Sequence, residues 1–269
     1  MSDPALTAGY AFILGGLGLI VGSFLNVVIY RVPRGLSIVR PGSACPACHA
    51  PIRARDNIPL VSWVLLRGRC RSCAAPISPR YPLVELLTAV VWLALGWWAW
   101  QPSGIDPLLP LLLVLGSAGV ALTLIDIEHH RLPDAMVLPL YPVTIVGLAL
   151  DGLLSGDWPV ATCLLSAGAW VGVIGGLWLV TGGRGMGLGD VKLAPILGAT
   201  LGWIGWGPSI VGIFAAFVLG GIVGLGLMIV RHAHGRTALP FGPFLIVGAG
   251  IGIFAGEAIA AAYLSAVGL

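Results

Sequence analysis

The sequence predicts an all-α polytopic membrane protein with about eight transmembrane helices and a small zinc-ribbon-like loop domain on the cytoplasmic side. Three observations support this prediction. Hydrophobic residues make up 58% of the 269 residues and charged residues only 9%, whereas a soluble domain carries about 25% charged residues. The apolar residues gather in runs long enough to cross about 30 Å of hydrocarbon. Four of the five cysteines lie in the one sizeable polar segment.

Eight apolar runs are the predicted spans, and the polar segment after the first run is the predicted loop. The spans are expected at about residues 8–30, 82–100, 107–125, 136–151, 160–180, 190–206, 209–230 and 242–264, the fourth and sixth being short. The first run has no basic segment before it, so it is expected to remain as an anchor. We divide the chain into residues 1–30, the first helix, residues 31–81, the loop domain, and residues 82–269, the transmembrane core.

Basic residues are confined to one side of the predicted membrane. Nine of the Arg residues lie between Arg31 and Arg80, and with eight spans every other Arg and the single Lys192 fall on the same side. The opposite loops carry Asp3, Asp106, Asp151 and Asp157 and no Lys or Arg. The positive-inside rule makes the basic side cytoplasmic.

Two aspartates stand at the ends of apolar runs, where a carboxylate costs about 2.5–3.5 kcal/mol on insertion scales. Asp126 ends the third span and Asp190 begins the sixth. Two spans separate them, so both are expected at the cytoplasmic face, where they can form an acid/base pair. Gly187 and Gly189 precede Asp190 and are expected to let the chain approach another backbone or an extended substrate.

Three other polar residues near the spans have structural explanations as well as functional ones. Asp134 follows Pro133 and is explained at least as well by a helix N-cap as by catalysis. Glu85 lies in the first turn of the second span, where the helix dipole favours an acid, or it faces the loop. Asn26 is either a hydrogen-bonding residue between helices or part of a binding cleft.

The loop carries two Cys-x2-Cys pairs, Cys45 with Cys48 and Cys70 with Cys73, separated by residues 49–69. A segment of about 50 residues rarely folds without a staple, and four thiolates can close a tetrahedral zinc site. A reducing cytoplasm disfavours a structural disulfide, and a redox Cys-x2-Cys motif is the alternative. Nucleic-acid binding is not indicated, because the arginines lack interleaved aromatics, and anionic lipids account for them.

Small residues recur at four-residue spacing in three predicted spans. The pairs are Gly172/Gly176, Gly220/Gly224 and Gly248/Gly252. They predict close helix packing within the chain, and association of two copies into a homo-oligomer is the alternative.

The motifs, taken in order, resemble those of the type IV prepilin peptidases, the bifunctional leader peptidase/N-methyltransferases of bacterial type IV pili and type II secretion. The matching segments cover most of the chain. They are Gly22–Arg31, the two cysteine pairs, Asp56–Leu60, Ile77–Pro82, Val84–Leu87, Asp126, Leu132–Asp134, Gly187–Leu193 and Pro240–Phe244.

The resemblance implies an aspartic endopeptidase of the bacterial inner membrane, with Asp126 and Asp190 as its catalytic pair. Its substrates would be prepilins and pseudopilins, whose basic leader is cut after Gly on the cytoplasmic side. The new N-terminal residue, usually Phe, would then be methylated with S-adenosylmethionine. The four cysteines match the tetracysteine of the family, and the loop with its flanking spans is the candidate methyltransferase region, whose donor-binding residues stay unassigned.

A transporter is the alternative from a different class. The two aspartates would then relay ions or protons across the membrane, and the zinc ribbon would regulate them. An inverted repeat between the two halves of the chain would favour this interpretation, and the sequence shows none.

Overall fold

The structure, a computed structural model, describes residues 4–101, 104–184, 186–231 and 240–268. The chain divides into two compact units, Met1–Ala121 and Leu122–Leu269, and the boundary falls within a helix, α4. The first unit holds α1 (Pro4–Arg31), η1 (Val32–Arg34), η2 (Ala54–Asp56), α2 (Val61–Leu65), α3 (Arg80–Ala99), β1 (Trp100–Gln101), β2 (Gly104–Ile105) and most of α4 (Leu109–His129). The second holds the end of α4, α5 (Asp134–Ser155), α6 (Val160–Thr181), α7 (Leu188–Ile204), α8 (Trp206–Arg231) and α9 (Gly242–Ala266).

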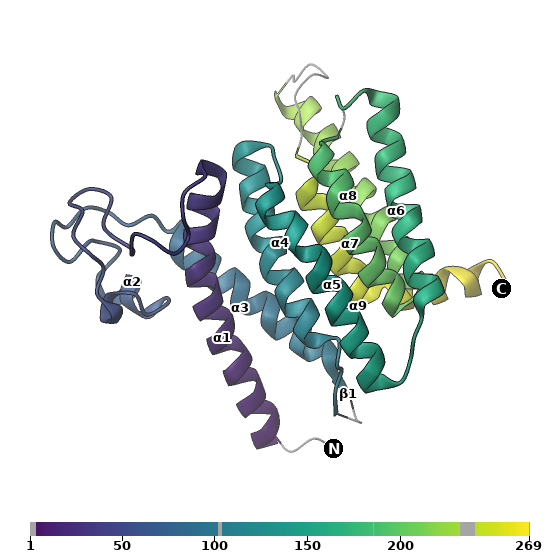
Figure 1. The fold of residues 1–269 in the computed structure, drawn as a ribbon, viewed down its shortest axis with the longest axis horizontal. Coiled ribbons are helices and arrows are strands. Elements are labelled where there is room, and N and C mark those ends of the chain that lie inside the picture. Colours follow the sequence, from purple (N-terminus) through teal and green to yellow (C-terminus); the bar gives the residue numbers. More distant parts are fainter. Residues whose placement is uncertain (1–3, 102–103, 185, 232–239, 269) are drawn as a thin grey trace. The chain divides into compact units, whose positions relative to one another are not determined.

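In the first unit α1 and α3 pack directly against each other (Figure 1). Glycine on α1 allows the close approach, since a Cβ added at Gly22 would lie 2.6 Å from the Cα of Glu85. One turn further along α1, the Nδ2 group of Asn26 donates a hydrogen bond to the carbonyl of Tyr81 over 3.1 Å. Asn26 therefore joins two helices, which is the first of its two sequence-based interpretations.

The loop between α1 and α3 contains two knuckles of the same construction. In the first, the N–H of Cys45 donates to Ala50 O and the N–H of His49 to Cys45 O. In the second, the equivalent bonds run from Cys70 to Ala75 and from Ala74 to Cys70. The residue after the second cysteine has positive φ in both, 56° at His49 and 57° at Ala74. The repeat Cys-x2-Cys-x-Ala-Pro-Ile, present at residues 45–52 and 70–77, thus encodes one local fold twice.

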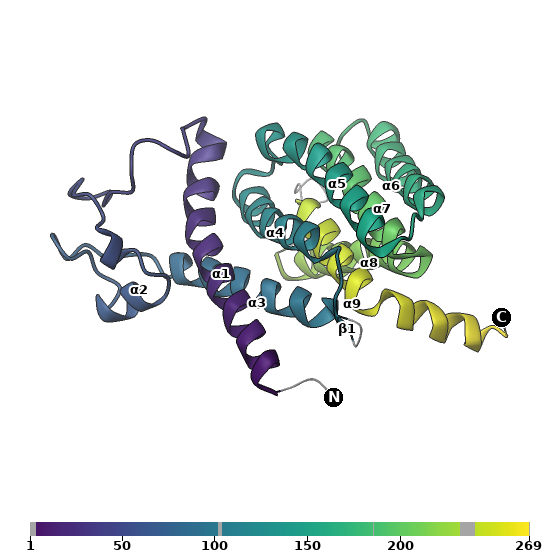
Figure 2. The same cartoon turned by 60° about the horizontal axis from the view of Figure 1, so that its bottom comes forward.

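The second unit is a helical bundle built around α7 (Figure 2). Helix α7 contacts α5, α6, α8 and α9, and α6 pairs closely with α7 as α8 does with α9. The core of the second unit contains Trp170, Ile174, Met186, Ala194, Leu201, Ala216, Leu245 and Ala249. Of the predicted glycine pairs, Gly248 meets α8 at the carbonyl of Gly212. In contrast, Gly172 and Gly176 of α6 have open space where a Cβ would project.

Seven of the described helices are long and apolar enough to cross a membrane, so the chain is a multi-pass membrane protein close to the predicted count of about eight. The remaining expected span, 190–206, is α7, whose 17 residues extend only about 25 Å. Helix α7 is enclosed by its neighbours, so it needs less apolar surface than a lipid-facing helix. Helix α5 is longer than the expected span 136–151, since it begins at Asp134 and continues to Ser155. Asp151 ends the apolar run in the sequence, but in the structure it is buried and accepts a 2.7 Å hydrogen bond from Trp203, so the helix does not end there.

Candidate active site

Asp126 lies near the C-terminal end of α4, and its side chain is only 4% exposed. Its Oδ2 atom accepts a hydrogen bond of 3.1 Å from the backbone N–H of Gly242, the first residue of α9. A Cβ at position 242 would lie 2.7 Å from that oxygen. Glycine therefore allows the start of α9 to approach the carboxylate, and the positive end of that helix favours a negative charge.

Asp190 is the third residue of α7 and is 5% exposed. Its Oδ2 atom accepts a 3.0 Å hydrogen bond from the N–H of Gly187, the N-cap residue. Its Oδ1 atom is buried and has no hydrogen-bond partner among the described residues. A buried carboxylate oxygen without a partner is costly, so Oδ1 is the oxygen of Asp190 that gains most from a new hydrogen bond.

The connection between α4 and α5 joins the two aspartate sites through Leu132. A Cβ added at Gly189 would lie 2.8 Å from the Cβ of Leu132, and one added at Gly242 would lie 3.3 Å from its Cδ1. The first turns of α7 and α9 thus both contact Leu132. The structure brings the two predicted catalytic aspartates to one cluster of helix ends, which we call the aspartate cluster.

Asp134 is neither the N-cap of α5 nor a member of the Asp126/Asp190 pair. It is the first residue of α5, Pro133 is the N-cap, and the Asp134 carboxylate binds the Nζ of Lys192 at 2.7 Å. Tyr141 donates its hydroxyl hydrogen to the carbonyl of Lys192 over 2.8 Å. The ion pair and the Tyr141 hydrogen bond connect α5 with the first turns of α7, and an exposed ion pair of this kind contributes little stability.

The four loop cysteines converge on one point. Their sulfur atoms all lie within 4.8 Å of one another, and the Sγ atoms of Cys45 and Cys73 are 3.9 Å apart. Zinc with bonds of 2.3 Å to four thiolates separates the sulfurs by about 3.8 Å. The backbone N–H groups of Cys48 and Ala47 lower the pKa of the Cys45 thiol to about 6. In contrast, the pKa of Cys73 is raised to about 12, because its hydrogen bond from the backbone of Ala75 is outweighed by the other thiols and by burial. The cluster can therefore bind zinc.

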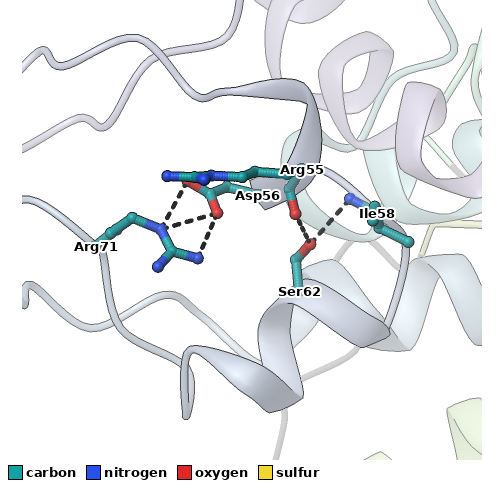
Figure 3. A network of polar contacts seen from close by, with 5 residues as sticks. All are labelled: Arg55, Asp56, Ile58, Ser62 and Arg71. Carbon is teal, nitrogen blue, oxygen red and sulfur yellow. Dashed lines mark hydrogen bonds and ion pairs between the residues drawn. The ribbon is translucent and has the colours of Figure 1, made fainter.

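Polar contacts connect the loop internally and to α3. Arg71, from the second knuckle, binds Asp56 with its Nε and Nη2 groups, at 2.7–3.0 Å (Figure 3). The guanidinium of Arg71 lowers the pKa of Asp56. The Oε2 atom of Glu85 accepts the backbone N–H of Leu60 at 2.8 Å. Glu85 thus faces the loop, as the second of its two sequence-based interpretations predicts.

Gly242, Leu132 and Lys192 were identified from the sequence only as members of family-matching segments, with Lys192 also counted among the basic residues, and none of them was given a role at the site. Gly242 stands between Phe241 and Pro243 at the start of the last apolar run, and a glycine before proline at a helix start is the signal that could have marked it.

Comparison with known proteins gives matches along both units. The model of the bacterial peptidase A24 N-terminal domain matches residues 17–99, and that of the type IV leader peptidase family matches residues 112–225. No solved structure matches the chain.

Curated relatives match nearly the whole chain. A prepilin leader peptidase/N-methyltransferase of Aeromonas salmonicida (strain A449) is 38% identical, over 93% of this chain and 92% of the relative. A protein of that name from Pseudomonas aeruginosa is 38% identical over 94% and 92%. One from Neisseria gonorrhoeae is 39% identical over 92% and 91%.

Proposed function

The chain belongs to the type IV leader peptidase family, and we propose that it is a prepilin leader peptidase with N-methyltransferase activity. One structural observation supports this most strongly. Asp126 and Asp190 are both buried, and each is held by a backbone N–H where helix ends meet at Leu132. No comparison favours the transporter alternative.

The proposed hydrolysis uses the two aspartates as one unit. Neighbouring carboxyls share a proton, because two adjacent negative charges repel each other. The ionised member takes a proton from water as the water oxygen attacks the scissile carbonyl carbon, and the protonated member gives its proton to the carbonyl oxygen. When the tetrahedral intermediate collapses, the C–N bond breaks and the leaving amine receives a proton from the pair. The pair acts as one unit, so the acid and base roles belong to both residues together.

The surrounding backbone would hold the carboxylates in place during this cycle. The N–H groups of Gly242 and Gly187 each occupy one oxygen of an aspartate, so rotation of either carboxyl costs a hydrogen bond. The Oδ1 atom of Asp190 remains for water or the substrate carbonyl. Fixed hydrogen bonds of this kind need no reorganisation at the moment of reaction.

The methyl transfer would follow cleavage, because it needs the newly released amine. S-adenosylmethionine is the co-substrate implied by the relatives' name. The deprotonated amine attacks the methyl carbon, the carbon–sulfur bond breaks, and S-adenosylhomocysteine and a proton leave. We assign the loop and its flanking helices α1 and α3 to this step. Zinc at the four cysteines would be structural, because four thiolates leave no open coordination position.

The proposed orientation puts the loop and the aspartate cluster on the cytoplasmic face of the bacterial inner membrane. It follows from the distribution of arginines and the positive-inside rule. Prepilins, and by the same chemistry pseudopilins, would enter with their apolar helix in the bilayer and their leader in the cytoplasm.

The direct test is to incubate the purified protein with a prepilin and S-adenosylmethionine and to measure the N-terminal mass of the product. We expect a pilin that lacks its leader and carries one methyl group. Cleaved but unmethylated pilin would limit the function to proteolysis, and uncleaved prepilin would contradict the proposal.

A further inference from the structure

Helix α2 in the loop has one inward face and one exposed apolar face. The Ser62 hydroxyl is buried, donates to the carbonyl of Arg55 and accepts the N–H of Ile58, each over 3.0 Å (Figure 3). The other side of the helix carries Val61, Val64 and Leu65, which lie at one-turn spacing and are exposed, Leu65 by 75%. Three exposed apolar side chains on one face of a short helix form a candidate contact surface.

The position of α2 is fixed relative to a membrane-spanning helix. Leu60, directly before α2, donates its N–H to Glu85, and Glu85 lies five residues after the start of α3 at Arg80. Five helical residues rise about 7.5 Å, and helical side chains lean towards the N-terminus. The Glu85 carboxylate therefore holds Leu60 beside the first turns of α3.

Helix α1 extends beyond the point where it packs against Glu85 of α3. The backbone at Glu85 lies against Gly22, and α1 extends from there to Arg31. Both views show α2 beside the beginning of α3 rather than beyond the C-terminal end of α1 (Figures 1 and 2). The exposed apolar face of α2 therefore lies level with the first turns of α3 and does not extend beyond the end of α1, and both helices are long and apolar enough to cross a membrane.

The charge of the loop matches an anionic lipid surface. Residues 31–80 contain nine Arg and one acidic residue, Asp56, which is paired with Arg71. Arg67 and Arg69 follow α2 directly. Arginines near a membrane attract anionic headgroups, and the same charge repels a basic peptide.

We propose that the face formed by Val61, Val64 and Leu65 inserts into the boundary between headgroups and acyl chains, with Arg67 and Arg69 at anionic headgroups. The occupant of the patch is the lipid of the bilayer that α1 and α3 cross. The loop is then an interfacial element held by Glu85 rather than a freely soluble domain, with an apolar face in the headgroup boundary and basic residues at anionic lipid.

The test places a photoreactive benzophenone amino acid at position 64 or at position 39 of the full chain, in nanodiscs with or without anionic phospholipid. Val39 is the matched control, because it is apolar, lies in the same loop and is 76% exposed against 65% for Val64. The zinc content of each variant is measured first, to show that the loop is folded. The adducts formed on illumination are identified by mass.

We expect lipid adducts at position 64 to exceed those at position 39 by about five-fold, and to increase when anionic lipid is present. Equal yields at the two positions would show that exposure alone governs labelling and would overturn the proposal. A prepilin adduct replacing the lipid adduct at position 64, when prepilin is added, would identify a peptide surface instead. Neither of these results depends on peptidase activity.

Discussion

The loop and the aspartate cluster position their functional groups by different means. In the loop, side chains do it, since four thiols converge, Arg71 binds Asp56 and Glu85 binds the N–H of Leu60. In the aspartate cluster, the backbone N–H groups of Gly242 and Gly187 hold the carboxylates, and the missing Cβ atoms allow the helices to meet. The loop should therefore be damaged by the removal of side chains, and the cluster by their addition.

Asp126 and Asp190 are the exception within the aspartate cluster, because their side chains are the reacting groups. Asp126→Asn or Asp190→Asn should each reduce leader cleavage by at least about 10³-fold, since one carboxyl cannot be both acid and base. Prepilin cleavage by the membrane-inserted variants measures this. Asp134→Asn is the control and should retain measurable activity, because Asp134 forms an ion pair with Lys192 and does not belong to the catalytic pair. Near-normal cleavage by either of the first two variants would exclude an aspartic mechanism.

Removal of one thiol tests whether the loop is damaged by the loss of a side chain. The purified protein should contain about one zinc ion per chain, because four thiolates close one site. Cys45→Ser or Cys73→Ser should lose most of that zinc and become more susceptible to proteolysis within the loop. Metal analysis and limited proteolysis measure the two effects. Full zinc occupancy in the chain lacking all four loop cysteines would disprove the assignment.

Addition of one methyl group tests the backbone contact in the aspartate cluster. In Gly242→Ala the new Cβ would be 2.7 Å from the Asp126 Oδ2 atom, so the carboxylate or the start of α9 must move. A displacement of about 1 Å can cost roughly 10²-fold in rate, and we expect a loss of about that size in prepilin cleavage. Gly250→Ala is the matched control on the same helix, since a Cβ there meets nothing within 4 Å. Equal activity of the two variants would refute the role of Gly242.

A smaller effect should follow from release of the loop at Glu85. Glu85→Leu removes the acceptor of the Leu60 N–H, whereas Glu85→Gln keeps an amide oxygen in the same place. Tryptic cleavage at Arg67 and Arg69 should be a few-fold faster in Glu85→Leu, in line with a lost hydrogen bond of about 1 kcal/mol. Glu85→Gln should behave like the unmodified protein. Equally fast cleavage in both variants would show that the carboxylate charge matters and not the hydrogen bond.

Local patterns in the sequence predicted those parts of the molecule that depend on local chemistry. Apolar runs predicted the membrane helices, since each must bury its own backbone hydrogen bonds, and cysteine spacing predicted the four-sulfur cluster. The C-terminal limit of α5 was misjudged because Asp151 ends the apolar run in the sequence, whereas in the structure it is buried, accepts a hydrogen bond from Trp203 and lies within a helix that continues to Ser155. The duplicated knuckle was visible as the repeat at residues 45–52 and 70–77, but cysteine spacing alone did not reveal it.

The contacts that hold the aspartates could not be predicted in the same way. Gly242 and Asp126 are 116 residues apart, and their hydrogen bond depends on how α9 packs against α4. A glycine next to proline at a helix start has many explanations in sequence, and only the packed structure shows which carboxylate its N–H approaches. The same holds for Leu132, whose contacts with two glycine-bearing helix starts arise from tertiary packing.

The central claim is that the aspartate cluster cleaves and the loop region methylates. It is tested most directly by measuring methyl incorporation from labelled S-adenosylmethionine into a pilin that already lacks its leader, with the unmodified protein, Asp190→Asn and Cys70→Ser. The account predicts that Asp190→Asn methylates normally while failing to cleave prepilin, and that Cys70→Ser loses more methylation than cleavage. A folded Asp190→Asn protein that cannot methylate, together with a Cys70→Ser protein that can, would contradict this division.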